Sequence, residues 1–446
     1  MTMPDVGTSL TERDLLEDLR AHAFAPSDAP TRIGLEVEQL AFHGIQTTPL
    51  TLILEALEPL VTLGELRNVT EEGKPPTFAS GDSLLTFEPG GQLEIVSPPR
   101  ESAAEALRDI AHLETLLDGA LTWRGIRRAN HGMTPWQGAD EISLQTPLPR
   151  YRCMQSYFSE ISPDGVRMMR LSCAIQINIG AGNADQVAHR WRLANLMSPI
   201  LIGMFANSPM AEARVTGWKS TRARVVANMD RSRTGMVLGA DGPADYLEFA
   251  LNAGVLMRRS SSGCVPGIPS LTFRDWLESG ELWGYPTLDD WHYHLSTLWP
   301  MVRPRGFLEL RAIDTSPVRW RSVPVAVVSA LLLDEDAGQS ALRILEPLHD
   351  RWQELATASA HDGLDDPEVC VLAQRLMKLA RGAFERLPTE WLDQSIVDDV
   401  RAFDEQYTGR GRCFADDLLD LHQPELRAAR RPPGHPTISD TVPRDA

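Results

Sequence analysis

The stretch Gly34-Leu35-Glu36-Val37-Glu38 alternates acidic and apolar residues in the pattern of a β-strand. In a strand, residues two apart point to the same face, so Glu36 and Glu38 would project together from a sheet. Two like charges this close repel each other unless something positive lies between them. Taken alone, the pair is equally consistent with a surface hairpin, so its meaning depends on whether the pattern recurs.

The pattern recurs in two further segments. Glu88-Pro89-Gly90-Gly91-Gln92-Leu93-Glu94 predicts the turn of a hairpin over 84–96, with Glu88 and Glu94 on one face. Phe307-Leu308-Glu309-Leu310-Arg311 places an arginine beside a glutamate in a third strand. Carboxylates on adjacent strands are natural ligands for Mg²⁺, which proteins usually share with nucleotide phosphates. Three such segments favour a metal-bound nucleotide over a surface hairpin.

Length and composition limit the class of protein. The chain has 446 residues, of which 43% are hydrophobic and 23% charged, so it can bury a large core. Its net charge of −18 argues against a nucleic-acid partner. The N-terminus is polar, and no apolar run approaches the roughly 18 residues of a membrane span, so we expect a cytoplasmic protein with no membrane partner. The five cysteines are scattered without a C-x-x-C pair, which fits reduced thiols better than disulfides or a zinc site.

The chain divides into four parts by its patterns. Residues 1–30 predict a short helix, capped by Ser9 and Glu12, and a lead-in. Residues 31–321 predict a catalytic core, residues 322–425 a helical region packed on it, and residues 426–446 a disordered tail. The core is expected to hold strands over 32–40, 84–96, 168–179 and 306–313, and helices over 50–63, about 18 residues from Ser102, and 184–206.

Polar residues gather in two more places. Gln176 and Asn178 share one face of the strand expected over 168–179. Between Lys219 and Arg233, five basic residues alternate with Ser, Thr and Gly, which we interpret as a loop that binds phosphate or carboxylate oxygens. A solvated basic loop is the alternative. The sequence has no Walker pattern, so metal and arginine rather than a glycine loop would hold a nucleotide.

A third motif, His292-Tyr293-His294, is the type that binds metal when it lies on a strand. Here Thr287 predicts the start of a helix. Two histidines two residues apart on a helix point about 200° apart. We therefore expect no metal shared between them.

These segments resemble the glutamate–cysteine ligases of the plant and bacterial type, within the glutamine-synthetase-like ligase fold. The resemblance runs from about Arg32 to Pro317, and the run Thr216-Gly217-Trp218 and the stretch 294–304 look most like the bacterial members that serve ergothioneine synthesis. It implies an α+β fold, with a largely antiparallel sheet lined by carboxylates and flanked by helices. Besides the acidic segments, it rests on Ala174-Ile175-Gln176-Ile177-Asn178, Ala206-Asn207-Ser208-Pro209 and Ser220-Thr221-Arg222.

The resemblance implies ATP-dependent ligation of L-glutamate to L-cysteine through γ-glutamyl phosphate, with ATP as co-substrate and more than one Mg²⁺. An acceptor other than cysteine, or a non-catalytic nucleotide-binding relative, stays open. By position, the implied metal ligands are Glu36, Glu38, Glu88, Glu94 and Glu309, the substrate contacts are Arg150, Arg222, Gln176 and Asn178, the nucleotide contacts are Arg224 and Arg311, and the catalytic residues are Glu309 and Arg311.

Three smaller expectations accompany the resemblance. A loop over 218–235 or 260–269 is expected to close over the site, because an acyl phosphate must be shielded from water. The redox-responsive cysteines of plant members have no matching pair here. Trp320 is a candidate for choosing the amine, with core packing as the alternative.

Overall fold

The computed structural model describes residues 10–260, 263–280, 282–388 and 390–429. A ten-stranded antiparallel sheet forms its centre, in the order β13-β14-β8-β1-β6-β5-β4-β3, with β2 and β7 also paired to β1. The long strand β1 is therefore the hub of the sheet. The strands are β1 Ile33–His43, β2 Gln46–Thr47, β3 Arg67–Asn68, β4 Phe78–Ser80, β5 Ser83–Phe87, β6 Leu93–Val96, β7 Arg127–Ala129, β8 Ala174–Gly180, β13 Val302–Pro304 and β14 Phe307–Asp314.

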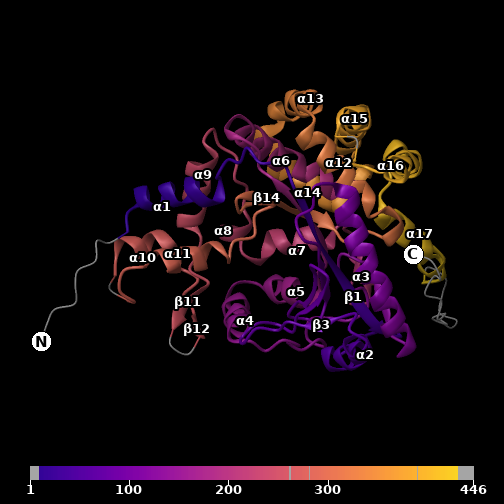
Figure 1. Cartoon of the computed structure of the whole chain (residues 1–446), viewed down its shortest axis with the longest axis horizontal. Helices are drawn as coiled ribbons and strands as arrows, with labels where there is room; N and C mark the ends of the chain where they lie inside the picture. Colours follow the sequence, from indigo (N-terminus) through magenta and orange to yellow (C-terminus); the bar gives the residue numbers. More distant parts are fainter. Residues whose placement is uncertain (1–9, 261–262, 281, 389, 430–446) are drawn as a thin grey trace, which may run out of the picture.

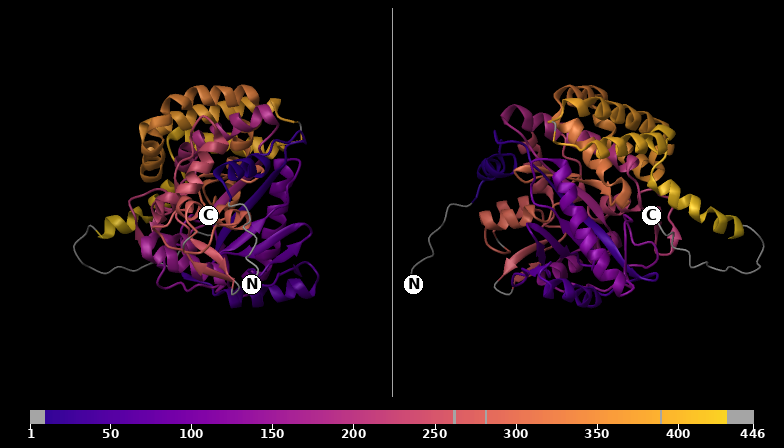
Figure 2. Two further views of the ribbon diagram at one scale, coloured as in Figure 1. Left: turned by 90° about the vertical axis from the view of Figure 1, so that its left-hand side faces the viewer. Right: turned by 45° about the vertical axis from the view of Figure 1, so that its right-hand side comes forward.

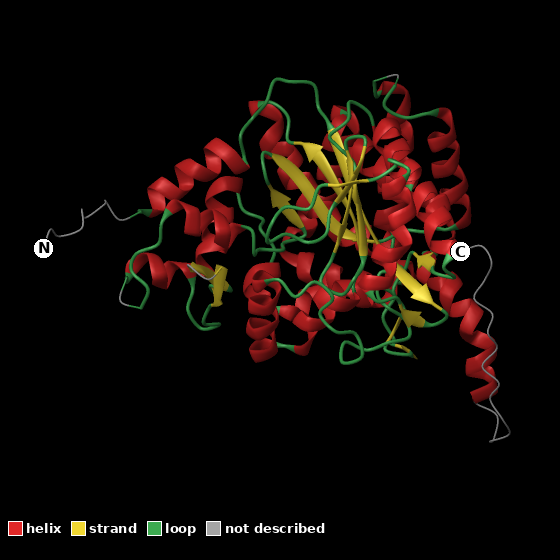
Figure 3. Cartoon of the chain, turned by 60° about the horizontal axis from the view of Figure 1, so that its bottom comes forward, coloured by secondary structure: helices red, strands yellow, loops and turns green. Residues whose placement is uncertain are grey.

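Helices cover the sheet on either side (Figure 3). Two short hairpins, β9–β10 (Met210–Ala211, Arg214–Val215) and β11–β12 (Met257–Ser260, Gly263–Pro266), stand apart from it. The chain is thus of the mixed α+β class. The helices before the C-terminal region are α1 Glu12–Asp18, α2 Leu50–Thr62, α3 Ala103–Trp123, α4 Pro149–Ile161, α5 Pro163–Leu171, α6 Ala184–Met204, α7 Thr221–Met229, α8 Arg231–Thr234, α9 Gly242–Asn252, α10 Phe273–Glu278 and α11 Leu288–Leu295.

The two faces of the sheet differ in polarity, as the period-two pattern predicts. Leu35 and Val37 of β1 and Ile177 of β8 are fully buried on one face, where α3 packs on β1 and α6 on β14. Each such side chain contributes about 1.5–3 kcal/mol relative to staying exposed. The other face carries the acidic side chains, which point into a cavity. Burial of the apolar face therefore fixes the direction of the carboxylates.

The expected core elements are largely confirmed. Strand β1, helix α2, the β5–β6 hairpin, helix α6 and strand β14 match their predictions within a few residues. Ser102 caps α3 by accepting from the N–H of Glu105, and Thr287 caps α11 in the same manner. At the N-terminus the cap of α1 is Thr11, paired with Asp14, rather than Ser9, which lies outside the described residues. The same Ser/Thr-x-x-acid pattern occurs two residues later and is the one used.

Two predictions for the core are wrong. The strand expected over 168–179 begins only at Ala174, because Ser162 caps and Pro163 starts helix α5, which runs through Leu171. The Arg-rich segment is helical rather than a loop, because Ser220 accepts from the N–H of Ala223 and starts α7. In both places the helix cap decides the secondary structure, although the residue types that follow it favour a strand or a loop.

The C-terminal region is helical, as expected, and lies on one side of the molecule, away from the β11–β12 hairpin (Figure 1). Two further views show the same helices gathered above the core (Figure 2). Helix α12 is buried along almost its whole length, against α3, α6, α15 and α16. The helices are α12 Ser322–Leu333, α13 Glu335–Leu345, α14 Trp352–Asp362, α15 Pro367–Ala383, α16 Gln394–Gln406 and α17 Phe414–Ala429.

The end of α17 overlaps the tail expected over 426–446. The helix continues to Ala429, so the first residues of that segment are helical, and residues 430–446 lie outside the described part. No helix in the described part of the chain is both long and apolar enough to cross a membrane.

Two of the scattered cysteines meet in space. The sulfur atoms of Cys153 on α4 and Cys264 on β12 lie 2.7 Å apart, and both thiols are free. A separation of 111 residues hides this contact in the sequence. Reduced thiols stay a prediction from the sequence, and these two cysteines are in contact rather than isolated.

A buried carboxylate at the end of β14 joins three segments of the core. The side chain of Asp314 is 1% exposed and is surrounded by donors. These donors are the N–H of Asn207 (2.8 Å), the hydroxyls of Ser208 (2.7 Å) and Ser220 (3.0 Å), and the Nε of Arg222 (2.8 Å). The network ties the start of α7 to the sheet.

Substitution of Gly132 tests how tightly this network is packed. A Cβ atom at Gly132 would lie 2.6 Å from Cγ of Asp314, which its hydrogen bonds hold in place. We expect Gly132→Ala to destabilise the protein by roughly 1–3 kcal/mol, as overpacking does elsewhere. Gly119, inside α3 with open space around it, is the control, and Gly119→Ala should stabilise by roughly 0.5–1 kcal/mol. Urea unfolding measures both, and an equal effect of the two changes would contradict the packing argument.

Candidate active site

The strand register brings the predicted acidic and amide residues into adjacent rows. Strand β1 lies between β6 and β8, and β8 pairs on its other edge with β14. Residues opposite each other across neighbouring strands have Cβ atoms about 5 Å apart. The opposite pairs are Glu38 with Glu94, Glu36 with Gln176, and Glu309 with Asn178.

Three of the five predicted metal ligands converge. Carboxylate oxygens of Glu38, Glu88 and Glu94 all lie within 4.8 Å of one another, the one group of this kind among the described residues. Burial raises the pKa of Glu88 to about 8, and the charge on Glu38 adds to the rise. Burial, and then the charge on Glu88, also raise the pKa of Glu94 well above its usual value. An oxygen-only, mutually repelling set of this kind fits a hard divalent cation such as Mg²⁺.

The other two predicted ligands lie beside this group but have protein partners. Glu36 lines the same cavity and accepts a hydrogen bond of 2.8 Å from Asn178. Glu309 is fully buried and accepts from Arg303 at 2.7 and 2.8 Å, as well as from Arg311. Burial by itself would raise the pKa of Glu309, but Arg311 and Arg303 lower it to about 2. Glu309 therefore anchors arginines in this structure.

The predicted arginines separate into those that reach the cavity and one that does not. Arg150, Arg222 and Arg311 line it. Arg311 donates to Oε1 of Gln176, and Arg150 donates to the Ser296 carbonyl at 2.9 Å. Of the predicted arginines, Arg224 alone is not among the described residues that line the cavity.

Two cationic residues near the site have other partners. Arg224 lies over the ring of Trp218, outside the cavity. Lys219 forms ion pairs with Asp365 and Asp416. These cations belong to the packing around the site.

The sequence reasoning missed Arg303. It lines the cavity from β13, directly opposite Glu309 in the β13–β14 pairing. Reading Val302-Arg303-Pro304 as a strand that pairs back onto 307–311 would have placed the two together. Its guanidinium, buried beside Glu309, adds a second positive charge next to Arg311.

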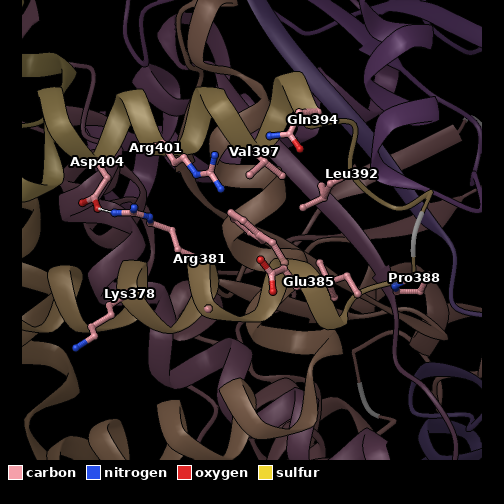
Figure 4. Close-up of a pocket in the computed structure, with 12 residues that line it drawn as sticks. Lys378, Arg381, Glu385, Pro388, Leu392, Gln394, Val397, Arg401 and Asp404 are labelled. Atoms are coloured by element: carbon pink, nitrogen blue, oxygen red, sulfur yellow. Dashed lines mark hydrogen bonds and ion pairs between the residues drawn. The ribbon is translucent and has the colours of Figure 1, made fainter.

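The cavity that these residues line has a volume of about 240 Å³. A larger hollow of about 850 Å³ lies between α15 and α16, where Arg381 forms an ion pair with Asp404 (Figure 4). None of the site residues predicted from the sequence lines the larger hollow. The smaller cavity is the candidate active site, because the carboxylates and arginines converge there.

Two residues that the sequence left open have packing roles. Nε2 of His292 donates to the carboxylate of Asp18 at 2.9 Å, whereas His294 is buried and donates from Nε2 to the carbonyl of Ala250 at 2.8 Å. Trp320 stacks edge-on against Phe403 away from the cavity. The two histidines thus have different partners, and the structure favours core packing for Trp320.

The raised pKa of Glu88 predicts a pH dependence of stability. In the metal-free protein, Glu88 holds its proton up to a pKa of about 8, against 4.5 for the ordinary group. The folded state therefore binds more protons than the unfolded chain in this interval, so stability falls as pH rises through it.

We expect Glu88→Gln to raise the melting temperature of the metal-free protein at pH 8 and to change it little at pH 5. Thermal unfolding with a chelator present measures this, and the exposed Glu65→Gln is the matched control. A gain for Glu88→Gln that is the same at both pH values would contradict the assignment.

Comparison with known proteins supports the resemblance noted in the sequence. The model of the glutamate–cysteine ligase family 2 matches residues 32–432. The glutamate–cysteine ligase EgtA of Mycobacterium tuberculosis is 32% identical over 418 residues, covering 90% of this chain and 84% of that protein. EgtA of Mycolicibacterium smegmatis is 33% identical, covering 91% of both chains.

More distant relatives match as well. The chloroplastic glutamate–cysteine ligase of Nicotiana tabacum is 27% identical over 431 residues, covering 93% of this chain and 80% of that protein. Among solved structures, the complex of the prokaryotic ubiquitin-like protein Pup with its ligase PafA matches with a TM-score of 0.38 and 9% identity, over 90% of this chain and 70% of that one. That score is too low to inform the fold. The family match spans nearly the whole chain and includes every residue of the cavity, so the chain belongs to the glutamate–cysteine ligase family 2.

Proposed function

We propose that the protein is an ATP-dependent ligase that joins the γ-carboxylate of L-glutamate to the amine of L-cysteine. The products are γ-glutamylcysteine, ADP and phosphate. The observation that carries this proposal is the convergence of Glu38, Glu88 and Glu94 with Arg311 in one cavity, in a chain of this family. Such a cavity suits small anionic substrates and a metal-bound nucleotide.

In the first step, a γ-carboxylate oxygen of glutamate attacks the terminal phosphorus of ATP, a P–O bond forms, and ADP leaves. Arg311 and Arg303 line the cavity beside the carboxylates, where they would stabilise charge on the transferring phosphoryl group. Glu38, Glu88 and Glu94, with Glu36 beside them, would hold Mg²⁺, which neutralises phosphate charge when bound. Gln176 orients Arg311 through its side-chain oxygen.

In the second step, the cysteine nitrogen attacks the carbonyl carbon of γ-glutamyl phosphate. A C–N bond forms as the C–O bond breaks, and phosphate leaves with the electrons of that bond and takes up the proton that the nitrogen loses. Arg222 and Arg150 would hold substrate carboxylates. Asp314 and the carbonyl of Arg311 fix the guanidinium of Arg222 before substrate binds, which lowers the cost of binding.

Water must be kept from the acyl phosphate between the steps. Since 221–229 and 231–234 are helical, the β11–β12 hairpin, which packs on α4, is the better of the two segments to close the site. The glutamine-synthetase-like fold and a role in ergothioneine synthesis belong to the same proposal, supported by the sequence resemblance. The cytoplasmic location stays a prediction from the sequence.

The direct test supplies purified protein with ATP, Mg²⁺, glutamate and a panel of amines while phosphate release and product mass are followed. Cysteine-dependent release with the mass of γ-glutamylcysteine is the expected result. Turnover with another amine in place of cysteine would favour a ligase of different acceptor. Absence of turnover with every amine would favour a non-catalytic nucleotide-binding relative.

Glu36→Gln tests the acidic row. Glu36 is half-buried beside like charges, and desolvation and the charge on Glu309 both raise its pKa, so its charge contributes little to folding. We expect the variant to lose turnover by at least about a hundredfold while it unfolds at the wild-type temperature or above. Steady-state kinetics and calorimetry measure the two properties, with Glu65→Gln as control. Full activity in Glu36→Gln would remove Glu36 from the site.

Arg222→Lys tests the proposed carboxylate clamp. Lysine keeps the charge but cannot bond both Asp314 and the Arg311 carbonyl while it presents a further N–H to substrate. We expect the KM for glutamate to rise about tenfold or more, and the KM for ATP to change less. Arg214→Lys, on the exposed β9–β10 hairpin, is the control. Equal effects on both KM values would instead assign Arg222 to the nucleotide.

A further inference from the structure

The candidate cavity has two chemically different walls. Strands β1, β6, β8 and β14 contribute carboxylate, amide and guanidinium groups to one wall. Helices α4, α5 and α7 and the segment before β13 contribute an apolar wall. Besides Tyr151, Val226, Trp299 and Pro300, this apolar wall includes five of the 14 methionines of the chain, Met154, Met168, Met169, Met229 and Met301, which we term the methionine wall.

A buried hydrophobic cluster lies behind the methionine wall. Met154, Met169 and Met229 are at most 5% exposed and belong to a hydrophobic cluster separate from the main core, with Tyr157 and Phe158. Among the described residues that line the cavity there is no leucine, isoleucine or phenylalanine, although these types dominate the main core. Methionine is therefore concentrated where the protein meets its substrates.

Two of the helices that line the cavity, α4 and α7, each carry an arginine and a methionine on the same face. Arg150 and Met154 are four residues apart on α4, and Arg222 and Met229 are seven apart on α7. Such spacings align side chains along one side of a helix, about 6 Å and about 10 Å apart along its axis. All four residues line the cavity. An amino acid whose α-carboxylate meets one of these arginines would direct its side chain toward a methionine.

Sulfur chemistry suits this wall to one substrate group. Thioethers are polarizable, contact other soft groups well, and accept hydrogen bonds only weakly. Moving a thiol from water to such a surface costs little free energy, whereas a hydroxyl group loses its hydrogen bonds to water without replacement. Glutamate and the phosphates of ATP have charged ends that match the opposite, polar wall. Of the three substrates, cysteine alone carries a soft, uncharged side chain next to the reacting amine.

We propose that the methionine wall is the subsite for the side chain of the acceptor amino acid and selects CH₂–SH over CH₂–OH. This inference rests on the proposed ligase function and deepens it by naming how the acceptor is chosen. The adenine ring of ATP is the rival occupant of an apolar wall. It is separated from the reacting phosphate by two further phosphates, so it lies farther from the carboxylate cluster than the acceptor does.

Met168 is the residue to change, because it is only half-buried and lies at the cavity. Met168→Gln keeps the length of the side chain and adds an amide that can bond a hydroxyl. We expect it to lower the ratio of kcat/KM for cysteine to that for serine by about tenfold, the effect of one hydrogen bond. Met168→Leu should change this ratio by less than about threefold, since it stays apolar. Met236→Gln, an exposed methionine outside the cavity, is the matched control.

A second measurement needs no variant. For 2-aminobutyrate, which has a methyl group in place of the thiol, the kcat/KM of the wild-type protein should lie within about tenfold of that for cysteine, because apolar surfaces separate methyl from thiol poorly. For serine, kcat/KM should be about a hundredfold lower than for cysteine. Serine used as well as 2-aminobutyrate would overturn the proposal. An unchanged cysteine-to-serine ratio in Met168→Gln would overturn it too, and so would a larger effect of that change on the KM for ATP than on the acceptor.

Hydroxylamine separates this proposal from the proposed function. As an acceptor without a side chain, it reports formation of γ-glutamyl phosphate and bypasses the methionine wall. Glutamate-dependent hydroxamate formation is expected in the wild type, and Met168→Gln should change the cysteine-to-serine ratio by a larger factor than it changes the hydroxamate rate. No hydroxamate in the wild type would refute the ligase function itself, whereas hydroxamate formed alongside an unchanged acceptor preference would refute the methionine wall alone.

Discussion

Repulsion among buried and half-buried carboxylates is the constraint on which the rest of the structure depends. Carboxylate oxygens of Glu38, Glu88 and Glu94 come within 4.8 Å of one another on three adjoining segments, and burial and the charges of neighbouring glutamates, Glu36 among them, raise the pKa of each. The apolar face of the sheet must supply the stability that this face lacks. The guanidinium of Arg311, which lowers the pKa of all three, is the compensating charge supplied by the protein itself.

Buried ion pairs then fix geometry more than they add stability. Desolvation of both partners offsets most of their attraction, whereas loss of one partner leaves an uncompensated charge. Arg303 and Arg311 on Glu309, and Arg222 on Asp314, are pairs of this kind. These ion pairs act on geometry, because they hold two guanidinium groups at the cavity before any phosphate binds. Preorganised charge of this sort stabilises a transition state without reorganisation during the reaction.

The sequence predicted those parts of the fold that depend on local pattern. The period of two in 34–38 and 307–311 placed Glu36, Glu38 and Glu309 on the polar face, because a one-residue slip would bury them in the core. Helix caps at Ser102 and Thr287 were equally visible. The start of β8 was not visible in the sequence, since Met168 and Met169 fit a strand as well as a helix. The partners of Arg303 and of Cys153 depend on long-range pairing, which no local pattern reveals.

Helices α4 and α7, which place arginines at the cavity of the carboxylates, also place methionines there. On α7, Arg222 is anchored to the sheet by Asp314 at one end, and Met229 is buried at the other, in the hydrophobic cluster with Tyr157 and Phe158. A tilt of α7 would therefore move the carboxylate clamp and the apolar wall together. In the proposed ligase, recognition of an acceptor by its α-carboxylate and by its side chain would then be coupled through one helix. A loop in place of α7 would allow the two contacts to vary independently and would weaken discrimination between acceptors of similar size.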